Sequence, residues 1–343
     1  MAHLSPTQSG IRIWRMPVAL RYGLLVAALL LAAALTLAIG QRSDVDPANL
    51  LHLLFVDDGS LARSAVIDVR LPRLLIAGLV GINLALAGLA LQAVTRNPLA
   101  SESVLGINQG AAFGIAVGAV MPWLVVVNLD VMAMLGAIAA GAVTFSIAGG
   151  LQGRLDSIRL ILGGVTVGAF SFACVRFVYT LDDDLTRLVL SWVSADISSA
   201  HYAQVFPLAF WSASGLIASL LLAHGFNILS LGDGATQGLG LDPRRVRLIG
   251  ALVAALLTGA SVSAAGPVMF VGLVVPHVCR LWFGQNHRLL VPAAALGGAA
   301  LVLLADAVSK LVRFPFETPL GIVCALIGAP YFLYATLRTR HMA

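Results

Sequence analysis

Long runs of apolar residues, each about 20 residues in length, follow one another along this chain and are separated by short polar connections. The runs lack the strict alternation of apolar and polar positions that marks barrel strands of about 10 residues. They instead predict helices that cross the hydrocarbon core of a bilayer, which takes about 20 residues. About ten spans are expected: Arg21–Gly40, Leu74–Val94, Gly106–Val127, Val131–Leu151, Ile158–Thr180, Gln204–Ala223, Val246–Ala265, Val268–Phe283, Leu290–Val312 and Pro319–Thr336.

The overall composition agrees with this pattern. Hydrophobic residues make up 59% of the chain and charged residues 11%, whereas roughly a quarter of the residues of a soluble protein are charged. The mean hydropathy is +0.95. We therefore expect an all-α integral membrane protein, a polytopic bundle in which residues 1–343 form one domain.

The distribution of basic residues predicts which way the bundle faces. An even number of spans places both termini on one side, and cytoplasmic connections carry an excess of Lys and Arg. Placing the termini inside puts these residues on the cytoplasmic face: Arg12, Arg15, Arg21, Arg96, Arg154, Arg159, Arg244, Arg245, Arg247, Arg280, Arg288, Arg338 and Arg340. Most acidic residues then lie on the opposite face, so cytoplasmic termini are expected.

A few basic residues fall on the outer side, against this rule. They flank the second and ninth spans and comprise Arg63, Arg70, Arg73, Lys310 and Arg313. Such side chains can extend toward lipid headgroups from helix ends. They can also form a basic rim that docks an acidic partner, because opposite potentials orient an encounter.

Pro276 is the residue that most suggests an irregular helix. It removes a backbone donor within a short span that begins just after Gly266 and Pro267. Broken helices at membrane depth are tolerated where they line a cavity or are buried in protein. We expect a broken helix at Pro276 and a cavity-lining or gating role for this span.

Charged residues inside the spans are scarce. Arg176 in the fifth span either extends toward the acidic stretch Asp182–Asp184 or faces a pathway and offers a fixed positive charge to an anionic cargo. Asp306 precedes Lys310 by one helical turn, which predicts a local ion pair.

The inner connection 225–247 is more apolar than a solvated loop. It carries Ile228, Leu229, Leu231, Leu239 and Leu241 among small residues, a spacing suited to short helices broken by glycine. These side chains need a covering surface, and a cytoplasmic protein is the natural candidate.

No Gly-x-x-x-x-Gly-Lys phosphate-binding loop occurs, and the only lysine is Lys310. Energy for uphill transport must therefore enter through another polypeptide or an ion gradient. The three cysteines, Cys174, Cys279 and Cys324, lie in apolar runs without metal-site spacing. No metal site is expected in this chain.

Several short motifs follow one another along the chain. They are Arg70-Leu71-Pro72-Arg73, Asn97-Pro98-Leu99-Ala100 within 92–106, the connection 232–240, Ala265-Gly266-Pro267, the run from Phe270 to His277, Ala305-Asp306, Pro319-Leu320-Gly321-Ile322 and Gly328-Ala329-Pro330. From Arg70 onward the chain resembles the FecCD/BtuC family, the permease subunits of ABC importers for iron chelates, haem and cobalamin.

This resemblance implies a type II ABC importer permease of ten helices in a bacterial inner membrane. It implies a homodimer, or a pseudo-symmetric heterodimer, with the path at the two-fold axis. Two ATP-hydrolysing subunits would dock on the cytoplasmic side, and a periplasmic or lipid-anchored substrate-binding protein on the other. ATP and Mg would be bound by the partner subunits, so this chain would be neither an enzyme nor a cofactor protein. No nucleic-acid partner is expected.

The resemblance also implies roles for individual residues. The residues that would couple the permease to the ATPase are Gly232, Ala235, Gly238, Leu239 and Gly240. The residues that would contact the binding protein are Arg70, Arg73 and Lys310. The cytoplasmic gate would be formed by Asn97, Leu99 and Ser157. The chain departs from the family pattern at Thr236-Gln237-Gly238, where an Arg-Ser pair is frequent.

The stretch 97–106 looks most like that of ferric siderophore permeases, and Arg176 suits an anionic chelate or haem propionates. We expect a preformed iron chelate carried by ATP-driven alternating access; haem or cobalamin is the alternative within the family. A more distant alternative is an ion-coupled secondary transporter, which would place acids near the midplane. Only Asp306 and Asp196 approach that depth.

Overall fold

Helices make up the regular structure of the described part of the chain. The computed structural model describes residues 16–40, 49–56, 59–121, 128–150, 155–178, 193–312 and 316–339. The elements within these ranges are α2 (Val18–Ala38), α3 (Leu50–Phe55), α4 (Leu61–Ser64), η2 (Ala65–Arg70), α5 (Leu71–Thr95), α6 (Ile107–Val120), α7 (Leu129–Ile147), α8 (Ser157–Val178), α10 (Tyr202–Leu229), α11 (Asp233–Gly238), α12 (Pro243–Ala265), α13 (Val271–Phe283), α14 (His287–Val312) and α15 (Leu320–Thr339).

Each of the expected spans corresponds to one helix. Within the described ranges, seven helical segments are long and apolar enough to cross a membrane. The apolar helices α6, α13 and α15 are shorter and coincide with the remaining three spans. The all-α polytopic bundle predicted from the apolar runs is therefore confirmed.

The helix ends follow local chemistry. Asp242 caps α12 through its side chain, which accepts a hydrogen bond from Arg244 N, and Pro243 occupies the first turn. Gly266 and Gly284 end α12 and α13 with positive φ angles of 72° and 76°, a backbone region that favours glycine.

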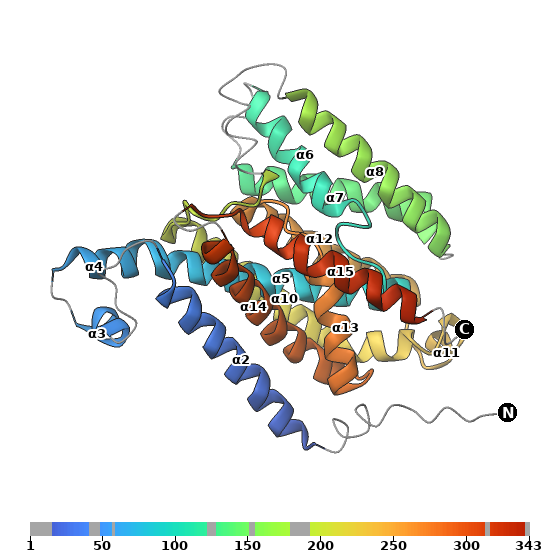
Figure 1. Cartoon of the computed structure of the whole chain (residues 1–343). Helices are drawn as coiled ribbons and strands as arrows, with labels where there is room; N and C mark the ends of the chain where they lie inside the picture. Colours follow the sequence, from blue (N-terminus) through green and yellow to red (C-terminus); the bar gives the residue numbers. More distant parts are fainter. Residues whose placement is uncertain are drawn as a thin grey trace.

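Helix α5 is the centre of the bundle. It packs against α10, α12, α13 and α14, and Figure 1 shows it running through the middle of the molecule. A Cβ at Gly81 would collide with the carbonyl of Gly298, and one at Gly88 with the carbonyl of Gly272. Small residues therefore allow the backbones of α5, α13 and α14 to come together.

The structure corrects the position of the expected helix break. Helix α13 continues through Pro276, and the non-helical stretch is 266–270, immediately before it. Proline has no N–H for the carbonyl four residues earlier, which belongs to Gly272. The side chain of Gln92 donates to that carbonyl, Nε2 to O, at 3.1 Å. A neighbouring helix thus replaces the missing donor, and α13 stays continuous.

The bundle has two distinct ends (Figure 1). The α4 end carries α4, η2 and the start of α5. At the other end, which we call the α11 end, Arg21 near the start of α2 donates to the carbonyl of Trp282 at 2.5 Å. Asn227 near the end of α10 accepts from His287 N at 2.8 Å. Helix α15 also ends there (Figure 1), so the first and last described helices reach the same end, as the even number of spans predicts.

The connection between α10 and α12 is shorter than expected. Helix α10 extends to Leu229 and α12 begins at Pro243, so 230–242 lies between them rather than 225–247. Leu229 belongs to α10 and is fully buried. The short helix expected in this connection is α11.

Candidate functional site

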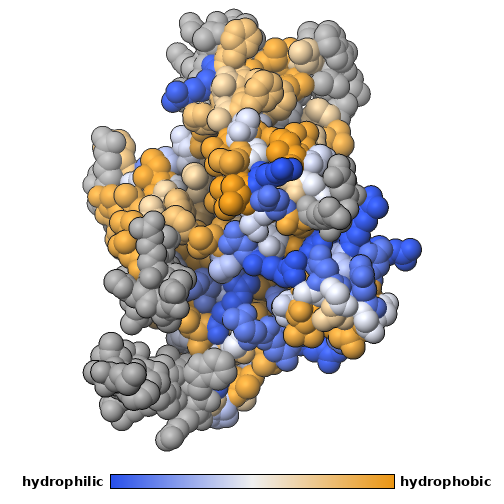
Figure 2. All heavy atoms as spheres, turned by 90° about the vertical axis from the view of Figure 1, so that its right-hand side faces the viewer, coloured by the Kyte–Doolittle hydropathy of each residue, from blue (hydrophilic) through white to orange (hydrophobic). Residues whose placement is uncertain are grey.

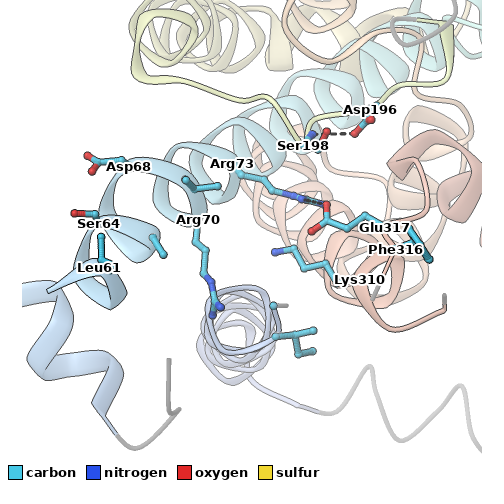
Figure 3. Close-up of a pocket in the computed structure, with 14 residues that line it drawn as sticks. Leu61, Ser64, Asp68, Arg70, Arg73, Asp196, Ser198, Lys310, Phe316 and Glu317 are labelled. Carbon is cyan, nitrogen blue, oxygen red and sulfur yellow. Dashed lines mark hydrogen bonds and ion pairs between the residues drawn. The ribbon is translucent and has the colours of Figure 1, made fainter. Parts of the chain in front are cut away.

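A cavity of about 730 Å³ opens at the α4 end. Arg70, Arg73 and Lys310, which sequence reasoning assigned to one rim, all line it (Figure 3). The acidic side chains of Asp68, Asp196 and Glu317 also line the cavity, so its charge is mixed rather than basic.

Four of the charged residues at this end form a largely buried group that we call the ion-pair cluster: Arg73, Asp306, Lys310 and Glu317. Arg73 Nε lies 2.7 Å from Asp306 Oδ1, and Lys310 Nζ lies 2.8 Å from Asp306 Oδ2. Arg73 also pairs with Glu317 (Figure 3). Asp306 is fully buried, whereas the side chain of Glu317 is 25% exposed.

The ion-pair cluster joins helices that are remote in sequence. Arg73 comes from α5, Asp306 and Lys310 from α14, and Glu317 from the segment before α15. Lys310 Nζ also donates to the carbonyl of Thr36 in α2 at 2.9 Å. The expected pair between Asp306 and Lys310 is confirmed, and it is one part of a larger network.

Arg70 donates to backbone carbonyls at the end of α2. Its NH1 donates to the carbonyl of Leu37 at 2.6 Å, and Figure 3 shows the side chain pointing toward α2. Arg63 similarly donates to the carbonyl of Leu53 at 2.9 Å. Arg313, the remaining basic residue expected at this rim, lies outside the described residues.

At the α11 end, the connection around α11 leaves apolar side chains uncovered. Leu231 is 66% exposed and Leu239 is 59% exposed. Figure 2 looks onto this end and shows hydrophilic residues gathered across it with hydrophobic residues among them. Of the residues assigned to coupling, Ala235, Gly238 and Gly240 are also exposed.

The side chain of Asp233, the first residue of α11, contacts two arginines. Its Oδ1 lies 2.6 Å from Arg247 NH2 and 3.2 Å from Arg96 NH2. Arg96 immediately precedes Asn97. Sequence reasoning missed this link because nothing in the linear pattern relates position 233 to position 96.

The residues assigned to the gate lie on two segments. Asn97 and Leu99 form a tight turn after α5, in which Asn97 Oδ1 accepts from Leu99 N at 2.9 Å. Ser157 begins α8 and is exposed. Their role as a gate stays a prediction.

Glu102 lies in the same connection as Asn97 and Leu99, outside the spanning helices, and is fully buried. Its carboxylate faces the start of α13, where a Cβ on Gly272 would collide with Oε2. Burial raises the pKa of Glu102 to about 7. The sequence alone did not single out this residue, and its burial became evident only from the structure.

Arg176 is exposed on α8, and its guanidinium carbon lies 4.9 Å from the centre of the Phe172 ring. This is a cation–π contact between residues one helical turn apart. The acidic stretch Asp182–Asp184 lies outside the described residues, so the two alternatives for Arg176 both stay open.

Comparison with known proteins places the chain in a family. The model of the FecCD transport family matches residues 25–338. The chain belongs to the FecCD transport family. The Fe(3+) dicitrate transport system permease protein FecC of Escherichia coli (strain K12) is 37% identical over 322 residues, which cover 93% of this chain and 97% of FecC.

Two further comparisons support the same family and fold. The hemin transport system permease protein HmuU of Yersinia pestis is 37% identical over 280 residues, 80% of this chain and 83% of HmuU. A solved structure of a metal-chelate type ABC transporter in an inward-facing conformation has a TM-score of 0.77 at 26% identity. The match covers 92% of this chain and 97% of that chain.

The FecCD membership confirms the resemblance found from motifs. The chain is an ABC importer permease of this family, a membrane transport subunit and not an enzyme, and ATP hydrolysis belongs to a separate subunit.

Proposed function

We propose that this FecCD permease imports a preformed iron chelate, a ferric siderophore in particular, by ATP-driven alternating access. The relatives support this substrate class, since FecC is named for Fe(3+) dicitrate and HmuU for hemin. Haem or cobalamin is the alternative cargo. Arg176, exposed on α8, would offer its positive charge to an anionic chelate.

The observation that carries the proposal is the uncovered apolar surface beside α11. Leu231 and Leu239 project from a connection at a largely hydrophilic end of the bundle. Exposed apolar groups of this kind mark a protein contact. An ATP-binding subunit is the partner that fits, with Gly232, Ala235, Gly238, Leu239 and Gly240 forming the contact surface. ATP and Mg would be bound by that subunit.

This assignment makes the α11 end cytoplasmic and the α4 end extracytoplasmic, with both chain termini in the cytoplasm of a bacterial cell. The gate residues Asn97, Leu99 and Ser157 would close the inner mouth of the path. A second copy of the chain would complete that path as a homodimer.

The cavity at the α4 end is the proposed contact for the substrate-binding protein. Because Arg73 and Lys310 already pair with Asp306, an acidic group of the partner would first exchange with Glu317, the more exposed of the two carboxylates. Arg70 lines the same cavity and would add a second contact.

Reconstitution in vesicles tests the transport proposal. The chain is incorporated with the ATP-binding subunit and the binding protein from the same organism, and uptake of radioactive ferric citrate, a ferric hydroxamate and haem is compared. Uptake should require ATP, Mg²⁺ and all three components, with a ferric siderophore carried best. Accumulation by the chain alone on an ion gradient would overturn the proposal and favour a secondary transporter.

A further inference from the structure

Two segments with separate proposed roles are joined by one side chain. The α11 segment would contact the ATPase, and the turn at Asn97 and Leu99 would form the gate. Asp233 of α11 pairs through the same oxygen, Oδ1, with Arg247 of α12 and with Arg96, the residue directly before Asn97. This contact gives movement of α11 a direct route to the turn.

The backbone at Arg96 makes that route effective. Arg96 ends α5 in the left-handed conformation, with φ 50° and ψ 33°, which is uncommon for a residue other than glycine. The chain changes direction at this residue and enters the turn in which Asn97 accepts from Leu99 N. A force on the Arg96 side chain therefore acts where the path of the turn is set.

The two arginines differ in how firmly they are placed. The side chain of Arg247 is 5% exposed and belongs to α12, whereas that of Arg96 is 39% exposed. Asp233 itself is 36% exposed. Exposed pairs contribute little to stability, so Arg96 can follow Asp233 when α11 moves without a large loss of stability.

The rest of α11 is attached along one side only. Thr236 is buried and its hydroxyl lies 3.3 Å from the carbonyl of Ile228 in α10. A Cβ at Gly234 or Gly238 would meet no atom within 4 Å. The open side is available to a partner, and pressure there would move α11 together with Asp233, its first residue.

We propose that Asp233 is a positioning residue that transmits movement of α11 to the gate turn through Arg96. This inference rests on the proposed function of both segments. It concerns coupling, so a change at Asp233 should separate ATP hydrolysis from gate movement rather than abolish either by unfolding the protein.

The experiment measures gate movement directly and needs no known substrate. In the complex with its ATP-binding subunit, Cys174, Cys279 and Cys324 are replaced by Ala, and Leu99→Cys provides a label site. The rate of reaction with a membrane-impermeant maleimide is compared without nucleotide and with ATP, Mg²⁺ and vanadate. In this parent the nucleotide should change the labelling rate at least about fivefold, the lower range of allosteric coupling.

Asp233→Asn should reduce that change to less than about twofold while ATP hydrolysis by the assembled complex persists, and Asp233→Glu should restore it. Asp242→Asn is the matched control. Asp242 is an exposed acid at the same end, and asparagine can still cap α12. This control should respond like the parent.

The outcomes separate the two proposals. A full response in Asp233→Asn would overturn the inference alone. A parent that hydrolyses ATP but shows no nucleotide-dependent labelling would overturn the gate assignment and this inference with it. If Asp233→Asn fails to assemble, Arg96→Ala removes the same pair from outside α11, and a full response in that variant would overturn the inference.

Discussion

The two ends of the bundle use the same kinds of charged residue in opposite surroundings. At the α4 end Asp306 is fully buried between Arg73 and Lys310. At the α11 end Asp233 lies between Arg96 and Arg247 but keeps 36% of its side-chain surface exposed. Water is excluded from the first carboxylate and reaches the second.

The difference shows which ion pairs hold the bundle together and which can change partners. A buried charge that loses its partner carries an uncompensated desolvation cost, whereas water replaces the partner of an exposed charge at little cost. The ion-pair cluster is therefore suited to fixing α2, α5 and α14 relative to one another. The pair of Asp233 with Arg96, in which both side chains are partly exposed, is suited to changing during a transport cycle.

The largest expected effect comes from breaking the buried side of this comparison. Asp306→Ala leaves Arg73 and Lys310 buried, and Glu317, the partner of Arg73, is then the one carboxylate left in the ion-pair cluster. We expect a loss of about 3–5 kcal/mol in the free energy of unfolding, and about 1 kcal/mol or less for Arg96→Ala, which breaks only the exposed pair with Asp233. Thermal unfolding of the purified protein in detergent measures both, and equal losses would contradict the comparison.

An apolar replacement shows whether the loss comes from unpaired charge. In the variant Arg73→Met, Asp306→Leu, Lys310→Met, the central charges are removed together and most side-chain volume is kept. Replacing buried ion pairs by apolar residues is often close to neutral. This variant should therefore be more stable than Asp306→Ala; a lower stability would show that shape rather than charge dominates.

Glu102, a buried carboxylate that pairs with no cation among the described residues, sharpens the comparison. Burial raises the pKa of Glu102 from its ordinary value of 4.5 to about 7. The folded state therefore loses stability relative to the unfolded state as pH rises from about 4.5 to about 7, and the full cost is present above that. Glu102→Gln removes this titration. As pH rises from 5 to 8, the free energy of unfolding of this variant should therefore increase by about 2 kcal/mol relative to that of the wild type.

Melting temperatures of both proteins across that pH range measure the gain. Asp242→Asn, which changes an exposed acid, serves as the control and should follow the wild type. Parallel curves for Glu102→Gln and the wild type would show that the carboxylate is not buried in the folded protein.

The smallest effect is expected at a fully solvated pair. Arg245 is 84% exposed at its side chain and lies 3.4 Å from Asp242. Arg245→Ala should change the free energy of unfolding by no more than about 0.5 kcal/mol. A urea or thermal titration that gives a loss above about 2 kcal/mol would mean that exposure does not rank these pairs.

Most of the fold could be predicted because its main determinant is local. A run of about 20 apolar residues specifies a spanning helix wherever it occurs, and the observed helices follow the expected spans. The error at Pro276 shows the limit of this reasoning. Proline removes a donor in any context, but only the packed structure brings Gln92 to the carbonyl that is left free.

The candidate site could be predicted in part. The basic residues Arg70, Arg73 and Lys310 stood out because they break the charge rule, and they do line one cavity. Their carboxylate partners did not stand out, apart from Asp306 one turn before Lys310. Glu317 and Arg73 are far apart in the chain, and a single sequence carries no sign that such residues meet.

The sequence by itself determined that this is a helical membrane protein without a nucleotide-binding loop, and its motifs indicated the family. These properties depend on the composition of segments and on short patterns, both of which are read along the chain. Only the tertiary structure decided that water is excluded from Asp306, that Glu102 is buried and that Asp233 contacts Arg96. Desolvation and ion pairing depend on which distant side chains are packed together, because electrostatic interactions are set by distance and burial rather than by order in the sequence.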